Sequence, residues 1–250
     1  MTARIVQYFL IKFFVLLFLF IPHQISYANE KINLLEQENL VEDSSKVNLY
    51  IEIAQNYIDT NFIMALKYAK KANNLAFKIN FPTGYITSLR LLSDANDYLG
   101  RYSIAQEINF KMLDYYKDKN DEESIQSTNI NIGIINYYQG NYNQSIEYTF
   151  KALNYYQNIN DLTGISICYN NLANVYSDQL NYQKALKYYF KALALDEKTN
   201  NTDGITLIKG NIGEVYIELQ EYEKAKQYLN EALIIAKENE DQWQQFVLVL

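Results

Sequence analysis

Three asparagines at a constant spacing of 40 residues, Asn131, Asn171 and Asn211, are the side chains of this sequence best suited to hold a ligand. A side-chain amide carries donors and an acceptor, so it can bond both the N–H and the C=O of an extended peptide backbone without reading the peptide's side chains. A single asparagine is more often structural, bonded to a neighbouring helix or to water. The row as a whole predicts recognition of a peptide backbone.

Catalytic chemistry has little support in the residue types. The single histidine is His23, the single cysteine is Cys168, and no Gly-rich phosphate loop is present. Neither a nucleophile–base pair nor a transition-metal site can be assembled from this set. The acidic runs at 121–123 and 238–241 are expected at helix ends, as solvated charges. The sequence therefore predicts a protein that is not an enzyme and that needs no cofactor or metal ion.

Two other residue types are predicted to be structural. Cys168 lies on an apolar helical face, where a buried small hydrophobe is expected rather than a reactive thiol. Tyrosine doublets at 115–116, 155–156 and 188–189 could stack on carbohydrate. Their spacing on helices instead predicts one tyrosine in the core and one on the outer face.

The composition narrows the class of protein. The 250 residues are 49% hydrophobic and 20% charged, which allows a sizeable folded core. Only two prolines and eight glycines are present, which favours helices over a turn-rich β protein. The formal net charge is −7 and no basic stripe occurs, so nucleic acid is not expected as a partner.

The first 28 residues resemble a secretory signal peptide. Arg4 and Lys12 precede the apolar block at 13–21, Pro22 ends the block, and Ser26 and Ala28 are small where a signal peptidase reads. The block is about half of the ~20 residues that span a bilayer, so an uncleaved anchor is the weaker alternative. We expect residues 1–28 to be removed on export to an extracytoplasmic space such as the periplasm. Residues 29–43 would then form a linker or a short helix.

The sequence repeats itself every 40 residues. The markers of this period are two series, Tyr102, Tyr142, Tyr182 and Tyr222, and Ala105, Ser145, Ala185 and Ala225. Within a unit, as at 164–180 and 181–201, apolar residues recur every three or four positions, which predicts two amphipathic helices joined by a tight turn. Five units are expected, at 44–83, 84–123, 124–163, 164–203 and 204–243.

The starts of three first helices carry a possible capping signal. Thr83, Thr163 and Asp203 each precede a glycine at a unit boundary. A side-chain oxygen at such a place can accept hydrogen bonds from the free amides of a first helical turn. We therefore expect these three residues to cap the helices that follow.

The fourth and fifth units resemble a known repeat family. The fourth reads Tyr169-x-x-Leu172-Ala173-x-x-Tyr176, then Ala185-x-x-x-Tyr189 and Ala192-Leu193, and the fifth reads Ile212-Gly213-x-x-Tyr216, then Ala225 and Ala232-Leu233. This pattern resembles the tetratricopeptide repeat, in the longer 40-residue form of kinesin light chains and bacterial peptide-sensing regulators. The first three units match it less well. The resemblance implies an all-α fold, a right-handed solenoid of stacked antiparallel helix pairs.

The resemblance also implies which residues face the inner, concave surface of the solenoid. In that family the residue before the Leu172 position faces inward, which would place Asn131, Asn171 and Asn211 in a groove. The same count adds Arg90, Asp94, Asp97, Tyr137, Tyr138, Asn174, Asp178, Glu214 and Glu218. The candidate ligand-binding residues are the three asparagines with Asn174, Tyr137, Asp178 and Glu214. The acids would favour a neutral or basic segment.

One binding mode of the family is not expected. Family members that hold a terminal carboxylate use lysines, an arginine and asparagines at fixed inner positions. The corresponding positions here hold Asn170, Ile130, Gly210, Ile167 and Leu207. Only Asn171 and its equivalents keep the family's residue type, so this carboxylate clamp is missing.

The expected function is an exported, non-enzymatic module whose groove binds a protein or an extended peptide segment. Residues 244–250, which are apolar from Phe246 onward, look like the start of an incomplete sixth unit, which indicates a truncated version of a longer protein. The alternative is therefore the sensor ectodomain of a truncated bacterial signalling protein, of the histidine kinase or diguanylate cyclase type. A third possibility is an envelope scaffold that uses its convex face. Contact with a membrane is expected only through an uncleaved amino-terminal segment.

Overall fold

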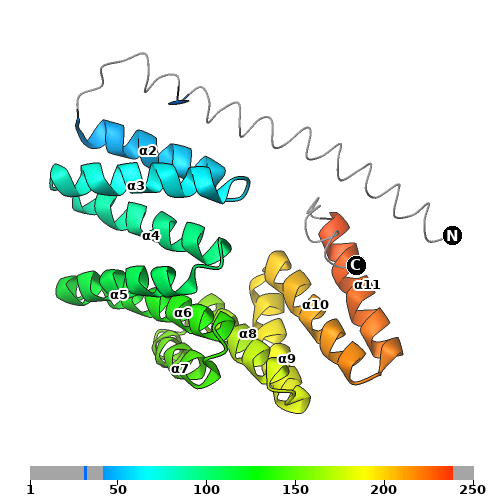
Figure 1. The fold of residues 1–250 in the computed structure, drawn as a ribbon. Helices are drawn as coiled ribbons and strands as arrows, with labels where there is room; N and C mark the ends of the chain where they lie inside the picture. Colours follow the sequence, from blue (N-terminus) through cyan, green and yellow to red (C-terminus); the bar gives the residue numbers. More distant parts are fainter. Residues whose placement is uncertain (1–30, 33–41, 239–250) are drawn as a thin grey trace, which may run out of the picture. The chain divides into compact units, whose positions relative to one another are not determined.

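A computed structural model describes residues 31–32 and 42–238, and the regular structure in this part of the chain is α-helical (Figure 1). The helices are α2 (Ser44–Tyr57), α3 (Phe62–Lys78), α4 (Pro82–Tyr98), α5 (Tyr102–Lys119), α6 (Glu122–Tyr138), α7 (Tyr142–Asn158), α8 (Leu162–Asp178), α9 (Tyr182–Thr199), α10 (Thr202–Glu218) and α11 (Tyr222–Glu238). None of these helices has the length and apolarity that a membrane crossing needs. The predicted signal peptide at 1–28 and the start of a sixth unit at 244–250 lie outside the described residues.

The helices follow the predicted period. The second helix of each pair begins at a residue 40 positions after the previous one, from Phe62 to Tyr222. The first helices α4, α6, α8 and α10 begin two residues before the unit boundaries expected at 84, 124, 164 and 204. The predicted all-α fold of helix pairs is confirmed.

Most helices end in a residue with a left-handed backbone, at a spacing of 20 residues. These residues are Asn80, Gly100, Asn120, Gly140, Asn160, Leu180, Asn200 and Gln220. The next residue donates its N–H back into the last helical turn, as from Phe81 to the carbonyl of Ala76 at 2.8 Å. Such a cap ends the helix and turns the chain, and glycine and asparagine adopt it most easily. Leu180 adopts it at φ 59°, which for a leucine is unfavourable by about 1 kcal/mol.

The predicted helix caps were wrong by two positions. Asp161 caps α8 by accepting hydrogen bonds from the N–H groups of Thr163 and Gly164, and Asn201 caps α10 by accepting one from Gly204. Helix α4 begins instead with Phe81, which makes no side-chain cap bond, followed by Pro82. The expected caps at 83, 163 and 203 lie inside the first turn. A side-chain oxygen reaches the free amides of the first turn only from a residue that precedes them in the chain. Asp161 and Asn201 meet this condition.

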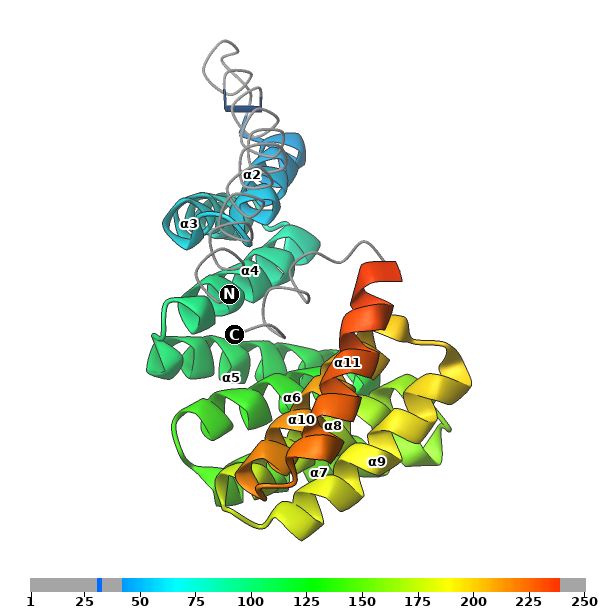
Figure 2. The same cartoon turned by 90° about the vertical axis from the view of Figure 1, so that its right-hand side faces the viewer.

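The chain divides into two compact units, whose boundary lies between Tyr115 and Tyr116 within α5. In unit 1, α3 packs against α2 and α4 around a core that includes Val47, Ile53 and Leu91. In unit 2, each helix from α6 to α11 packs on the next, and Leu172 and Ile212 are buried in its core. Neighbours such as α10 and α11 run side by side in opposite directions (Figures 1 and 2).

Small residues mark the close approach of the two helices of a pair. A Cβ atom added at Gly133 of α6 would lie 2.9 Å from Oγ1 of Thr149 on α7. One added at Gly213 of α10 would lie 2.6 Å from Cγ of Leu229 on α11. These distances are shorter than van der Waals contact, so a larger residue at either site would displace its neighbour on the second helix.

Candidate functional site

The first helices of unit 2 present equivalent rows of side chains. Helix positions i, i+4, i+7 and i+11 face one direction. These rows, here called the first-helix stripes, are Ser127, Asn131, Ile134 and Tyr138 on α6, Ile167, Asn171, Asn174 and Asp178 on α8, and Leu207, Asn211, Glu214 and Glu218 on α10. Helix α8 contacts both α6 and α10, so the three stripes are neighbours.

The stripes are accessible, and their character changes along the helices. Ile167 and Leu207, near the helix starts, are 44% and 54% exposed although they are apolar. The asparagines in the middle are half-buried, and Asp178, Glu214 and Glu218 at the helix ends are exposed. Each stripe of α8 and α10 therefore runs from an apolar residue through an amide to an acid.

The three predicted asparagines are not equivalent. The side-chain Nδ2 of Asn211 donates to Oδ1 of Asn170 on α8 at 3.1 Å, and Oδ1 of Asn174 lies 3.5 Å from the same nitrogen. The buried Tyr189 donates its hydroxyl to Oδ1 of Asn174 at 2.6 Å. Asn211 and Asn174 therefore help to join α8, α9 and α10, which is the structural role weighed for a single asparagine.

The side-chain nitrogen of Asn171 is not used by the fold. Its Nδ2 atom is buried and has no hydrogen-bond partner among the described residues. An unsatisfied buried donor destabilises a protein by about 1–3 kcal/mol, so a hydrogen bond from this nitrogen to an acceptor of a ligand would be favourable. Asn131 lies at the same level on α6 and is half-buried.

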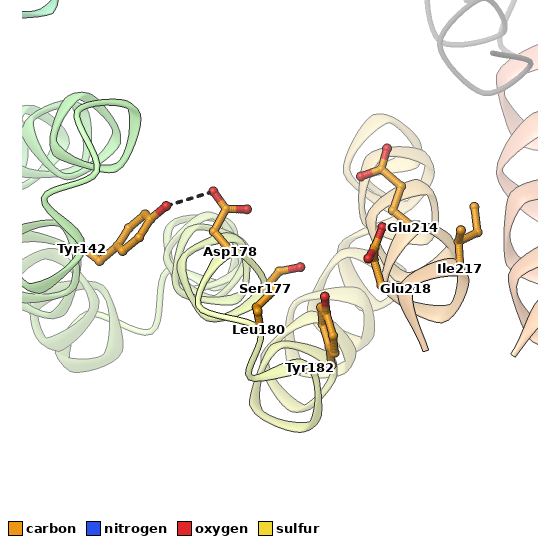
Figure 3. A pocket seen from close by; sticks show the side chains of 8 residues that line it. All are labelled: Tyr142, Ser177, Asp178, Leu180, Tyr182, Glu214, Ile217 and Glu218. Carbon is orange, nitrogen blue, oxygen red and sulfur yellow. Dashed lines mark hydrogen bonds between the residues drawn. The ribbon is translucent and has the colours of Figure 1, made fainter. Parts of the chain in front are cut away.

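A cavity of about 560 Å³ lies at the carboxyl ends of the α8 and α10 stripes (Figure 3). It is lined by Tyr142, Ser177, Asp178, Leu180, Tyr182, Glu214, Ile217 and Glu218. Tyr142 and Asp178 stand on one side, Glu214 and Glu218 on the other, and Tyr182 lies between them (Figure 3). The structure thus brings the predicted residues Asp178 and Glu214 together at one cavity.

Tyrosine hydroxyls orient the carboxylates of this cavity. Tyr142 donates its hydroxyl to Oδ2 of Asp178 at 3.5 Å. Burial raises the pKa of the predicted Tyr137, and Asp178, which accepts its hydroxyl, raises it further. Burial and a hydrogen bond to Glu218 likewise raise the pKa of Tyr182. The raised pKa values keep the hydroxyls of Tyr137 and Tyr182 protonated at neutral pH, so both act as donors to the carboxylates.

Although the Glu214 side chain is exposed, partial desolvation of its carboxyl group by surrounding protein raises its pKa above the usual value. Desolvation penalises the charged form of a carboxyl group. A cation brought to the cavity would favour the ionised carboxylate and offset this penalty.

Sequence reasoning missed the residues that complete the cavity. Tyr142 and Tyr182 are the first residues of α7 and α9. In the sequence they were recognised only as markers of the 40-residue period. Ser177, Leu180 and Ile217 lie at or just beyond the helix ends. The signal that could have found them is the tight turn, because it places the first residue of a second helix beside the last residues of a stripe.

The remaining inner-face candidates do not join this cavity. Arg90, Asp94 and Asp97 belong to α4 in unit 1. Tyr138 is exposed at the end of the α6 stripe. In the part of the chain that the structure describes, no group of three acidic, cysteine or histidine side chains is arranged to hold a metal ion.

Cys168 is buried, as predicted. Burial, with a smaller contribution from Asp161, raises the pKa of its thiol to about 12. The thiolate is the reactive form of cysteine, so this thiol is inert at neutral pH.

Asp94 is expected to make the stability of the chain depend on pH. Burial raises its pKa from 3.8 to about 6, with Arg90 opposing the shift and Asp97 adding to it. Between these values the unfolded chain ionises Asp94 while the folded chain holds the proton, so the free energy of unfolding falls as pH rises from about 4 to 6. Asp94→Asn should remove this loss and raise stability at pH 7 by about 2 kcal/mol.

Urea unfolding at pH 4 and at pH 7, for the original chain and for Asp94→Asn, checks this prediction. Asp203→Asn, at an exposed aspartate of α10, is the matched control. Equal pH profiles for Asp94→Asn and the original chain would contradict the assignment.

The comparisons with known proteins agree with the helix pairs. Tetratricopeptide-repeat models match residues 124–198 and 208–239. No curated protein matches the sequence. A Rap conjugation gene regulator of plasmid pLS20, solved with the Phr* peptide, superposes with a TM-score of 0.72 at 16% identity, over 84% of this chain and 60% of that chain.

Two further solved structures share the fold. BtubC from P. vanneervenii superposes with a TM-score of 0.63 at 19% identity, over 88% of this chain and 91% of that chain. A signal transduction ATPase from Pyrococcus horikoshii with a tetratricopeptide repeat sensor superposes with a TM-score of 0.67 at 25% identity, over 82% of this chain and 32% of that chain. Kinesin light chain-like repeats are also among the similar structures. Residues 124–198 and 208–239 therefore carry tetratricopeptide repeats, in the all-α fold of helix pairs that is typical of such repeats.

Proposed function

We propose that unit 2 is a non-enzymatic module that binds an extended segment of a peptide or protein across its first-helix stripes. The observation that carries this proposal is the alignment of the stripes on α6, α8 and α10. Each has an asparagine at the same level, and Ser127, Ile167 and Leu207, four residues before these asparagines, are exposed. A surface of this kind can recognise a peptide backbone at regular intervals.

The spacing of the stripes fits an extended chain. Packed helices lie about 8–10 Å apart, and three residues of extended chain advance by about 10 Å at ~3.3 Å each. A bound segment could therefore present every third peptide group to one asparagine. The similar Rap structure was solved with a peptide bound, which supports a peptide as the ligand class.

A second proposal concerns the longer protein to which such repeats can belong. The Pyrococcus horikoshii ATPase carries a tetratricopeptide repeat sensor, and this chain matches 32% of that protein. This similarity supports the alternative hypothesis of a sensor domain, in which unit 2 would bind a ligand and an attached module would produce the signal. Export of the chain stays a prediction from the sequence.

The groove proposal is tested with a display library of random twelve-residue peptides selected on the purified chain. The affinity of the selected peptides is then measured by fluorescence polarisation for a triple variant with Asn131→Ala, Asn171→Ala and Asn211→Ala. We expect a loss of at least about ten-fold, because each amide contact contributes about 1 kcal/mol.

The matched control is a triple variant with Asn143→Ala, Asn154→Ala and Asn230→Ala, at exposed asparagines of the second helices α7 and α11. It makes the same chemical change away from the stripes and should bind as the original chain does. Equal losses in both triple variants, or a library that yields no binder, would contradict the proposal.

A further inference from the structure

We infer that the cavity at the ends of the α8 and α10 stripes receives a lysine or arginine side chain of the bound segment. This inference rests on the proposed function and adds the chemistry of the ligand. The cavity, at about 560 Å³, has the size of a ligand pocket rather than of a packing defect. It lies at the end of the proposed groove where the stripe residues change from asparagine to aspartate or glutamate.

The charges of the cavity favour a cation. Three of its eight lining residues are acidic, and none is a lysine or an arginine. Elsewhere in unit 2, some acids are paired with lysines, as Glu231 is with Lys209 at 2.6 Å and Glu147 with Lys151 at 2.7 Å. In the cavity, Asp178 and Glu218 instead accept hydrogen bonds from the hydroxyls of Tyr142 and Tyr182. A tyrosine hydroxyl carries no positive charge, so a cation from outside the chain is the complementary partner for these acids.

The placement of the carboxylates suits a long basic side chain. Asp178 stands on one side of the cavity and Glu214 and Glu218 on the other, so an ammonium or guanidinium group that entered would have carboxylates on both sides (Figure 3). A guanidinium donates several N–H bonds in fixed directions and can bridge two carboxylates. The turn from Asn174 to Asp178 rises by about 6 Å, a distance that the stem of a lysine or arginine spans.

Leu180 provides an apolar surface for that stem. Its side chain is 71% exposed beside the cavity, although its backbone has the left-handed conformation that glycine fills at the equivalent Gly100 and Gly140. Lysine and arginine lay their methylene groups along apolar surface and keep the charged end in a polar site. A leucine is unfavourable for the left-handed backbone conformation of this turn, but its side chain provides apolar surface for such a ligand.

The test uses the peptides selected from the random library. We expect the binders to share a lysine or arginine, and a peptide in which that residue is replaced by glutamine to bind about ten-fold more weakly. The double variant Glu214→Gln and Glu218→Gln should lose a similar factor for the original peptide and should no longer distinguish the glutamine peptide. Glu197→Gln with Glu223→Gln, at exposed acids of α9 and α11, is the matched control and should change neither affinity.

A charge reversal keeps the inference testable if removal of the acids alters the fold. The variant Glu214→Lys and Glu218→Lys should prefer a peptide whose basic residue is replaced by glutamate. Binders that depend on the asparagines but carry no shared basic residue would overturn this inference alone. Binders whose affinity is indifferent to both the acids and the asparagines would overturn this inference and the proposed groove together.

Discussion

Replacing Leu172 by alanine is expected to lower the free energy of unfolding of unit 2 by about 3 kcal/mol. Leu172 is fully buried, at 0% exposure, in the core that α8 shares with its neighbours. The substitution removes three carbon atoms from a packed interior and leaves a cavity that the surrounding helices fill only in part. Because each helix pair is stabilised by the next, the substitution should also destabilise the helices that neighbour α8.

Urea unfolding followed by the helical circular dichroism signal measures this loss. Leu207→Ala is the matched control, because Leu207 lies on the neighbouring first helix and is 54% exposed. The same chemical change there should alter stability by less than about 0.5 kcal/mol. A similar loss at both positions would show that the helix, rather than the buried contact, determines the effect.

Replacing Gly164 by alanine should destabilise unit 2 by about 2 kcal/mol, although alanine is the better helix former. A Cβ atom at this position would lie 2.5 Å from Cδ1 of Tyr156 and 2.8 Å from Oδ2 of the capping Asp161. Tyr156 is buried in the core of unit 2, so its ring has little room to move. The clash lies between the end of α7 and the start of α8, where one helix pair packs on the next.

A double-mutant cycle with Tyr156→Ala separates this clash from other effects. In the Tyr156→Ala background Cγ and the ring are gone, so Gly164→Ala should cost little or even stabilise by up to about 1 kcal/mol. Urea unfolding of the four proteins gives the coupling free energy. A cost of Gly164→Ala that is the same in both backgrounds would mean that the Tyr156 ring does not cause it.

Much of the architecture could be predicted from local patterns. The 40-residue period placed the pairs of helices, because apolar residues every three or four positions form one face of a helix. The burial of Cys168 followed from the same rule. Two of the three caps were misplaced because an Asp or Asn two residues earlier competes with the Thr or Asp beside the glycine, and at the third the helix begins after Phe81, which has no cap oxygen. Only the backbone geometry shows which oxygen precedes the free amides.

The candidate site was predictable only in part. Residues on one stripe, such as Asn171 and Asp178, could be grouped by counting along a helix. The different states of Asn171 and Asn211 could not, because they depend on which side chains of α8 meet α10.

The sequence by itself determined that this protein is a series of amphipathic helix pairs with asparagines at one repeated position. Periodicity and composition act through neighbours three or four residues away, and these are visible in the chain. Only the tertiary structure decided that Tyr142, Tyr182, Asp178 and Glu214 share one cavity. Residues up to 76 positions apart, from Tyr142 to Glu218, meet there because α7, α8, α9 and α10 pack in succession. That proximity arises from the packing of whole helices, which no local pattern records.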